Sequence, residues 1–473
     1  MLFNSIEFLL FLPIVFLLYW FVFNKNLKSQ NLLILLSSYV FYGWWDYRFL
    51  TLIFLSTIVD YIIGLNIPKQ DSEKKQKLLL WCSVLFNLSV LGFFKYYNFF
   101  VDSWIDLFGS IGYEIKSIWT LNIILPVGIS FYTFQTMSYT IDIYRKKLEP
   151  TKDFISFASF VSFFPQLVAG PIERATNLLP QILNKREFKY KQGVQGLRLI
   201  LWGMFKKVVI ADSLAPMVDN IFSNYEDFGG GTLWLGAIYF AFQIYCDFSG
   251  YSDIAIGTSK LFGFELISNF KFPYFSRNIG EFWRKWHISL STWFRDYLYI
   301  PLGGSKEGKW KSIRNIFIIF LVSGFWHGAN WTFIFWGLFH SILFLPSFIY
   351  NTNRKYTTSI IAENTFLPSP KEFIQVGVTF ILVTTGWVLF RSETIVDSFN
   401  YLSKMFFEFD IPQNFRKGIL YVIGLTLLDF IIKGNERMNF KKSHSLELLG
   451  SVILVLVILF FYNQSSSFIY FQF

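Results

Sequence analysis

The sequence has little charge, little cysteine and little histidine. Only 16% of its 473 residues are charged and 53% are hydrophobic, which excludes an ordinary soluble domain. Its two cysteines, Cys82 and Cys246, lie inside apolar runs, which argues against a disulfide framework and against thiolate metal ligands. Four histidines are too few to suggest a zinc site, so we expect no metal. The G-x-S-x-G elbow of serine hydrolases is also absent from the sequence.

Long apolar runs fill most of the chain. A helix needs about 20 residues to cross the hydrocarbon core of a bilayer, and runs of this size include residues 3–23, 78–100 and 372–390. We therefore predict an all-α polytopic membrane protein, a bundle of roughly 11–12 transmembrane helices in one domain over residues 1–473. No basic residue precedes the first run, so we expect a retained span and not a signal peptide.

The formal net charge of +10 does not indicate nucleic-acid binding. The Lys and Arg residues sit in short loops beside apolar runs, where the excess of positive charge on the cytoplasmic side of membrane proteins accounts for them. Basic loops near residues 24–30, 68–77 and 144–153 mark one side of the membrane, and acidic residues near 102–114 mark the other. We therefore predict that the amino terminus lies outside the cytoplasm.

Two of the apolar runs are unsuited to a continuous span. Residues 154–170 end in "FFPQLVAG" before a further proline, and prolines break a helix. Residues 286–302 carry His287, Arg295 and Asp296 among aromatic residues and are followed by two glycines. Irregular backbone at membrane depth is tolerated only where protein or a water-filled cavity surrounds it. We predict two re-entrant segments around a cavity within the bundle.

The stretch "LVSGFWHGANWTFIFWG" places His327 and Asn330 in a run that otherwise has the composition of a membrane interior. Ionisable groups at membrane depth are costly and usually face a polar cavity. An imidazole in an apolar site resists protonation because desolvation disfavours its charged form, and a neutral imidazole can accept a proton from an attacking hydroxyl. His327 is therefore our candidate for a general base, and a hydrogen-bonded core histidine is the alternative.

Other polar residues interrupt the apolar runs less distinctively. The segment "YCDFSGYSDIAIG" contains Asp247, Ser249 and Asp253. Carboxylates in a membrane bundle can orient a base, bind a sugar hydroxyl or carry protons, but polar helix packing explains the pattern equally well. Of the remaining histidines, we expect His340 to be a packed helix residue and His444 to be a solvated loop residue.

Five motifs occur in order along the chain: "SFYTFQTMSYTIDIYR", "FFPQLVAGPI", "YCDFSGYSDIAIG", "FWRKWHISLSTWFRDYLYIPLGG" and "FWHGANWTFIFWG". In this order they resemble the membrane-bound O-acyltransferases, the MBOAT family, and above all its bacterial branch of alginate and peptidoglycan O-acetylation proteins. The resemblance covers nearly the whole chain. It implies an MBOAT-like bundle around a central funnel or tunnel, in a bacterial cytoplasmic (inner) membrane.

The resemblance also implies a chemistry. It matches His327 to the family's catalytic histidine and His287 to the histidine of its "WHISLSTW"-type motif. It implies an acyl group, usually acetyl, taken from a cytoplasmic thioester such as acetyl-CoA, with no permanently bound cofactor. The acceptor would be a hydroxyl of an extracytoplasmic polysaccharide, alginate-like or peptidoglycan, served by a periplasmic SGNH-type acetyltransferase partner. A thiol has a pKa of about 8.5, so its thiolate leaves with little protonation and one base can suffice.

Further residues are candidates for supporting roles. Asn330, His287 and backbone amides are equal candidates for stabilising the oxyanion. Supporting or substrate-binding roles are assigned to Asn330, Asp247, Ser249, Arg295 and Asp296. Candidates for attracting the phosphates of coenzyme A are Arg284, Lys285, Lys306, Lys309 and Lys311. Ordinary anchoring by positive charge on the cytoplasmic side explains the basic residues at least as well.

The terminal "SSSFIYFQF" places Tyr470 among phenylalanines. An aromatic tail is usually an interfacial anchor. The alternative is that the tail folds back into the funnel and its phenol relays the acyl group, as the similar ending of a small peptide in the related teichoic-acid D-alanylation system suggests. A phenol has a pKa of about 10, so this relay needs a neighbouring base, for which His327 is the candidate.

Two other classes of function compete with acyl transfer. In a transporter or flippase of an activated group, His327 and Asp247 would line the path, but the internal repeat that transporters often show is not seen in the sequence. The third class is a scaffold for a polysaccharide secretion complex. The sequence does not specify the polysaccharide or the length of the acyl group.

Overall fold

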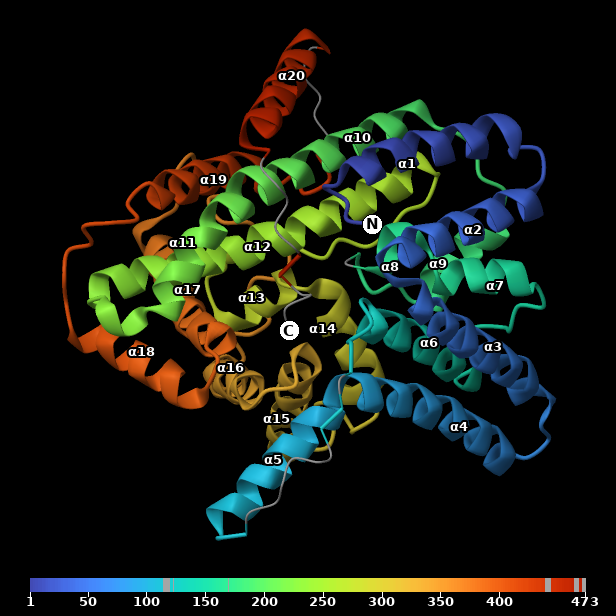
Figure 1. The fold of residues 1–473 in the computed structure, drawn as a ribbon, viewed down its shortest axis with the longest axis horizontal. Helices are drawn as coiled ribbons and strands as arrows, with labels where there is room; N and C mark the ends of the chain where they lie inside the picture. Colours follow the sequence, from blue (N-terminus) through green and yellow to red (C-terminus); the bar gives the residue numbers. More distant parts are fainter. Residues whose placement is uncertain (114–119, 122, 169, 439–443, 463–467, 470–473) are drawn as a thin grey trace. The chain divides into compact units, whose positions relative to one another are not determined.

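The computed structural model describes residues 1–473 apart from 114–119, 122, 169, 439–443, 463–467 and 470–473. Every regular element within the described residues is a helix (Figure 1), which confirms the predicted all-α class. The chain divides into two units, Met1–Gly193 with Thr258–Leu266, and Val194–Gly257 with Ile267–Phe473. A single domain over the whole chain stays a prediction.

The first unit consists mainly of apolar helices. They are α1 (Ile6–Leu17), α2 (Leu27–Asp46), α3 (Leu50–Asn66), α4 (Glu73–Leu91), α5 (Tyr97–Ser110), α6 (Ile129–Tyr144), α7 (Phe154–Val161), α8 (Phe164–Leu167) and α9 (Ala175–Leu183). The Asp153 carboxylate accepts the backbone N–H groups of Ile155 and Ser156 at the start of α7, which satisfies donors that a helix terminus leaves open. The predicted re-entrant run near 154–170 thus contains two helices too short to cross a membrane, and its re-entrant placement stays a prediction.

Buried polar side chains join α3, α4 and α6. The Asp60 carboxylate accepts hydrogen bonds from Ser83 Oγ at 2.5 Å and from Asn87 Nδ2 at 2.8 Å. Ser83 Oγ also lies 2.9 Å from Thr140 Oγ1. Hydrogen bonds between helices help hold membrane bundles together, so these groups have a structural explanation.

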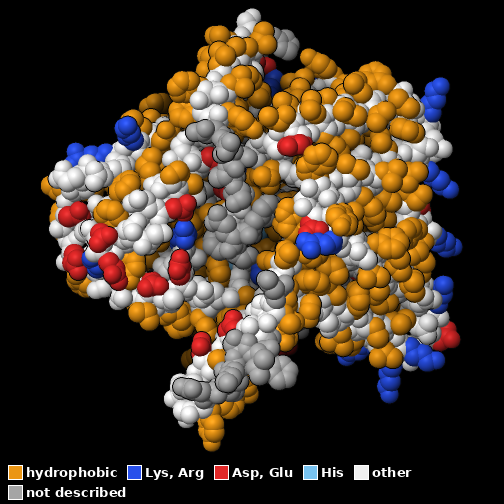
Figure 2. Space-filling view, in the orientation of Figure 1, with side chains coloured by type: hydrophobic (Ala, Val, Ile, Leu, Met, Phe, Trp, Pro, Cys, Tyr) orange, Lys and Arg blue, Asp and Glu red, His pale blue; other side chains and the backbone are white. Residues whose placement is uncertain are grey.

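Apolar side chains cover much of the face drawn in Figure 2. By length and composition, segments able to cross a membrane are Leu27–Lys69, Glu73–Ser110, Trp331–Ile349 and Pro370–Arg391, and shorter apolar segments are Ile6–Val22, Phe154–Leu167, Gly418–Ile432 and Glu447–Phe461. These segments support a multi-pass membrane protein, whereas the number of roughly 11–12 spans stays a prediction.

Basic side chains gather along one edge of the first unit. In Figure 2 they line the right-hand edge, where Figure 1 places the α1–α2 and α3–α4 turns. Those turns carry the exposed residues Lys25, Lys28, Lys69 and Lys74. Two of the predicted basic loops therefore lie on the same side of this unit, as the positive-charge pattern requires.

The second unit carries all four histidines of the chain. Most of α10 (Tyr190–Met204) and α12 (Gly230–Leu261) belong to it. Its other helices are α11 (Asp212–Ser223), α13 (Ile279–Lys285), α14 (Ile288–Phe294), α15 (Lys309–His327), α16 (Trp331–Ile349), α17 (Pro370–Arg391), α18 (Ile395–Phe407), α19 (Gly418–Ile432) and α20 (His444–Phe461).

Glycines let α15 and α16 pack closely. A Cβ atom built on Gly324 would collide with the carbonyl oxygen of Phe333, and one on Gly337 would collide with that of Phe320. Small residues at such positions allow the backbones of membrane helices to approach each other. The close pairing fixes the end of α15, where His327 lies.

Candidate active site

Two histidines meet in the interior of the second unit. His327 is the last residue of α15, and His287 immediately precedes α14. Their ring centroids are 6.2 Å apart, and their exposed fractions are 3% and 1%. The structure thus brings together the two histidines that the sequence motifs singled out, although 40 residues separate them.

The backbone and one hydrogen bond hold His287 in place. Its φ of 43° lies in the left-handed region, which is costly for a residue with a side chain and is found often at functional sites. His287 Nδ1 lies 3.1 Å from Asn269 Oδ1, and the same oxygen accepts from Ser289 Oγ at 2.9 Å. The other amide atom, Asn269 Nδ2, donates to Ser252 Oγ at 3.2 Å.

These contacts select one tautomer of His287. Because Asn269 Oδ1 can only accept, Nδ1 must carry the imidazole proton. Nε2 then presents a lone pair, and it is a buried atom with no hydrogen-bond partner in the part of the chain that the structure describes. Burial lowers the pKa of His287 to about 3, since desolvation disfavours the imidazolium. The side chain is therefore a neutral hydrogen-bond acceptor at Nε2.

Aromatic rings enclose His327. The ring centroids of Trp326, Trp336 and Phe390 lie 5.1, 5.2 and 5.4 Å from that of His327. Such a wall keeps bulk water away from the imidazole, which strengthens electrostatic interactions at the site. The arrangement fits a base that works in its neutral form.

His340 has a different environment. It is fully buried in α16, with the rings of Trp283 and Trp336 at 5.0 and 4.9 Å. These contacts agree with the packed helix residue predicted from the sequence.

The carboxylates of Asp247 and Asp253 on α12 form ion pairs that the sequence analysis did not predict. Lys207 Nζ lies 2.7 Å from Asp247 Oδ1 and 2.8 Å from Asp212 Oδ1. Lys206 Nζ lies 2.7 Å from Asp253 Oδ2, and it also donates to Ser249 Oγ at 2.8 Å. Both lysines are buried. Their position inside the apolar run "LWGMFKKVVIA" was an available signal, because charged residues in such runs usually face a partner.

Asp247 also binds the end of the chain. The backbone N–H of Ile469 donates to Asp247 Oδ2 at 2.6 Å. The neighbouring Phe468 ring lies 4.4 Å from that of Tyr251 and 6.0 Å from that of Phe248, and Phe248 contacts His287 at 4.6 Å. One aromatic ring thus separates this terminal segment from the histidine pair. Tyr470 lies outside the described residues.

The predicted residues Asn330, Arg295 and Asp296 form hydrogen bonds or ion pairs with other protein groups. Asn330 caps α16, because its Oδ1 accepts from the Thr332 N–H at 3.0 Å and its Nδ2 donates to the Glu393 carbonyl at 2.9 Å. This amide is therefore already engaged in holding a helix end. Arg295 and Asp296 pair with each other at 2.7 Å.

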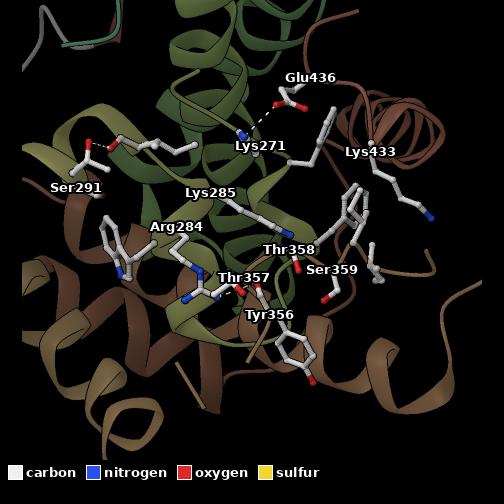
Figure 3. A pocket seen from close by; sticks show the side chains of 18 of the residues that line it. Lys271, Arg284, Lys285, Ser291, Tyr356, Thr357, Thr358, Ser359, Lys433 and Glu436 are labelled. Carbon is white, nitrogen blue, oxygen red and sulfur yellow. Dashed lines mark hydrogen bonds and ion pairs between the residues drawn. The ribbon is translucent and has the colours of Figure 1, made fainter. Parts of the chain in front are cut away.

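Basic residues line a cavity of about 510 Å³ that also carries hydroxyl groups (Figure 3). Its Lys271 pairs with Glu436 at 3.2 Å. Arg284 donates to the backbone carbonyls of Asn353 and Tyr356. Lys285 pairs at 2.7 Å with the buried carboxylate of Glu281. The lining hydroxyl residues are Ser291, Thr292, Tyr356, Thr357, Thr358 and Ser359.

A second polar cavity, of about 710 Å³, shares Ser291 and Arg295 with the first. Lys306 and Lys309 line this second cavity. Lys311 instead pairs with Glu307 at 3.0 Å, and both of these side chains are exposed. Of the five basic residues predicted to attract phosphates, two therefore line the first cavity, two line the second, and Lys311 forms an ion pair at the surface.

Comparison with known proteins identifies relatives that match most of the chain. Residues 144–359 match the model of the membrane-bound O-acyltransferase family, MBOAT. "Probable alginate O-acetylase AlgI" of Pseudomonas syringae pv. tomato is 43% identical over 398 residues, which are 84% of this chain and 73% of that protein. "Peptidoglycan O-acetyltransferase" of Helicobacter pylori is 34% identical, over 93% of this chain and 83% of that protein. "Teichoic acid D-alanyltransferase" of Bacillus subtilis is 28% identical, over 58% and 70%.

The chain therefore belongs to the membrane-bound O-acyltransferase family, and it is an O-acyltransferase. This confirms the family and the enzyme class predicted from the five motifs. His287 and His327 both lie within the matched residues 144–359. These relatives are named as enzymes, which favours an enzyme over the transporter and the scaffold considered from the sequence.

Proposed function

We propose that the protein is an O-acetyltransferase of the bacterial cytoplasmic membrane that acetylates hydroxyls of an extracytoplasmic polysaccharide, alginate-like or peptidoglycan. The buried pair of His287 and His327 supports this proposal most directly, because both imidazoles lie in the interior of a chain that is 43% identical to a protein named as an alginate O-acetylase. The acyl donor in this proposal is acetyl-CoA or another cytoplasmic thioester, used as a substrate.

His327 acts in this proposal as the general base. A hydroxyl attacks the thioester carbonyl while the imidazole accepts the hydroxyl proton. The tetrahedral intermediate then collapses, the C–S bond breaks, and the group leaves as a thiolate, which can take the proton from the imidazolium. The acetyl group ends as an ester on the attacking oxygen.

In this proposal His287 supports the reaction as a hydrogen-bond acceptor, because its tautomer leaves Nε2 without a proton. Its Nε2 lone pair can accept a hydrogen bond from the attacking hydroxyl, which orients that group. The same atom has no proton to donate, so His287 is a poor candidate for stabilising the oxyanion. The Asn330 amide is engaged at the start of α16. Backbone N–H groups are therefore the remaining oxyanion donors among the candidates considered.

The two basic cavities are the proposed binding region for the donor. Lys306 and Lys309 line the larger one, and their ammonium groups would attract the phosphates of coenzyme A. Arg284 and Lys285 hold the cavity wall through Asn353, Tyr356 and Glu281. Charge reversal at Lys306 and Lys309 should therefore raise the apparent KM for acetyl-CoA and weaken its salt dependence, whereas an unchanged KM would favour simple anchoring.

The chain terminus is proposed to relay the acetyl group. The contacts of Phe468 and Ile469 with α12 support this, because they hold the residues before Tyr470 near the histidine pair. With His327 as base, the phenol of Tyr470 would take the acetyl group and pass it to a periplasmic SGNH-type partner. Tyr470→Phe keeps the aromatic ring and removes the nucleophile.

Labelled acetyl-CoA tests the whole proposal. Purified protein in liposomes, supplied with [14C]acetyl-CoA on one face and alginate or peptidoglycan with the candidate partner on the other, should label the polymer. Tyr470→Phe should abolish polymer labelling. Full labelling by Tyr470→Phe would exclude the relay, and absence of any acetyl transfer from the thioester by the wild type would exclude the proposed donor.

A further inference from the structure

An apolar cavity of about 520 Å³ lies among residues of α12, α17 and α19. Its wall includes Phe242, Phe373, Phe380 and Leu427. Neither of the paired histidines lines this cavity. Its volume is within the range of sites that bind small molecules, which is about 300–1,000 Å³.

One polar atom of the cavity wall is left without a partner. Tyr274 donates its hydroxyl hydrogen to the Ala241 carbonyl at 2.5 Å, and Thr426 donates to the Val422 carbonyl at 2.7 Å. Asp429 is only 5% exposed. Its Oδ2 accepts from the Tyr245 hydroxyl at 3.0 Å, but its Oδ1 is a buried atom with no hydrogen-bond partner among the described residues.

An unsatisfied carboxylate oxygen in an apolar wall requires an explanation. Burial of such an atom without a partner is costly, and isolated cases in native proteins usually have a reason. The position on α19, an apolar helix, increases this cost, because hydrocarbon supplies no hydrogen-bond donor. A ligand that brings a donor into the cavity would remove it.

We infer that this cavity binds a neutral membrane lipid that carries a free hydroxyl group, with the hydroxyl donating to Asp429 Oδ1 and the acyl chains lying against the aromatic wall. A phosphate-bearing headgroup is disfavoured, because no Lys or Arg lines the cavity among the described residues. The neighbouring Lys433 lies over the Phe430 ring at 3.7 Å and donates to the Ala362 carbonyl at 3.4 Å.

Two short-chain lipids test the hydroxyl requirement. The probe is 1,2-dioctanoylglycerol, and the matched control is its 3-acetyl ester, which has no hydroxyl hydrogen. In native mass spectrometry or calorimetry of the purified protein in micelles, the probe should bind about tenfold or more tightly than the ester, as expected for a hydrogen bond to a carboxylate. Equal binding of the two, or tighter binding of dioctanoyl phosphatidylethanolamine, would overturn the inference.

Substitutions of Asp429 separate the hydrogen bond from the fold. Asp429→Asn keeps an acceptor oxygen and should retain most of the preference for the probe. Asp429→Leu should remove that preference while still binding both lipids through their chains. Preference retained in the Leu variant would show that the hydroxyl binds elsewhere and would overturn the inference.

Two glycines provide a matched pair that tests the place of binding. A Cβ atom on Gly377 or on Gly424 would meet no atom within 4 Å, so each position accepts a side chain without a clash. Gly377 lines the cavity, whereas Gly424 of α19 does not. Gly377→Leu should therefore weaken probe binding at least tenfold, and Gly424→Leu should leave it unchanged. Equal effects of the two would place the lipid outside this cavity.

Discussion

Asn269 controls the chemistry of His287 without belonging to any recognised motif. Its Oδ1 contacts His287 Nδ1 at 3.1 Å and Ser289 Oγ at 2.9 Å, so one amide oxygen orients the ring and the start of the following helix. The lone pair of His287 Nε2 points away from this contact. A positioning residue of this kind should affect the rate through the tautomer of the histidine.

Replacing Asn269 should therefore slow the reaction more than it weakens substrate binding. We expect Asn269→Leu to lower kcat by about ten- to a hundredfold, the range for a lost hydrogen bond of about 1–3 kcal/mol, with a smaller change in KM. Ser289→Ala is the control, because it removes the hydroxyl that donates to Asn269 Oδ1 and leaves the contact of that oxygen with His287 in place. Steady-state kinetics with labelled acetyl-CoA would measure both, and equal losses in the two variants would contradict a role in positioning.

The lowered pKa of His287 predicts that the folded protein becomes less stable as the pH falls. Burial lowers that pKa to about 3, whereas an exposed histidine titrates near about 6.5. Below pH 6.5 the unfolded chain binds a proton that the folded protein does not, so stability is unaffected by His287 above this pH and falls as the pH drops toward 3. The Tm of the wild type in detergent should fall more steeply between about pH 7 and pH 4.5 than that of His287→Gln. Parallel Tm curves would contradict the neutral, buried imidazole.

Sequence reasoning found the catalytic candidates of this site but not their partners. His327 was recognisable because an imidazole inside an apolar run is costly. Asn269 gave no comparable signal, since a single asparagine in an irregular segment is common. Lys206 and Lys207 were overlooked because their carboxylate partners Asp253 and Asp247 lie 47 and 40 positions away in the sequence.

Helix α12 connects Phe468 and Ile469 to the histidine pair. Asp247 accepts the Ile469 N–H, and the next residue, Phe248, contacts both His287 and Phe468. Lys207 holds the other oxygen of Asp247 at 2.7 Å. The helix thus provides a fixed acceptor and an aromatic surface for the last described residues of the chain.

Hydrogen exchange should report this contact directly. The Ile469 amide should exchange slowly in the wild type, because its hydrogen bonds to a buried carboxylate. Asp247→Leu removes the acceptor and should make this amide exchange at least tenfold faster, whereas Asp247→Asn should keep most of the protection.

Asp253→Asn is the control for this experiment. It changes a carboxylate on the same helix that pairs with Lys206, and it should leave exchange of the Ile469 amide unchanged. Fast exchange of this amide in the wild type would show that the terminus is not bound at Asp247.

Elements were easier to predict than their contacts. The apolar run at 372–390 corresponds to α17, because hydrophobic length alone indicates such a helix. The runs near 154–170 and 286–302 contain short, broken helices, as their prolines and polar residues predicted. The bond between Asp247 and Ile469 joins residues 222 positions apart, and no local pattern encodes such a contact.

For the whole molecule, family membership and the buried imidazoles point to one chemical role. The chain belongs to the membrane-bound O-acyltransferases, and its two adjacent histidines are buried. Exclusion of water from such a site would protect an activated acyl donor from hydrolysis. The central claim is that the His327 imidazole accepts the proton of the attacking hydroxyl.

The most direct test of this claim compares His327→Gln with the wild type in a single assay of acetyl transfer. Glutamine keeps a polar side chain but is not a base at neutral pH. With [14C]acetyl-CoA as donor, we predict that His327→Gln lowers transfer by about 10²- to 10⁴-fold, the usual contribution of a general base, while its Tm stays close to that of the wild type. A folded His327→Gln variant that retains activity within a few fold of the wild type would contradict the claim.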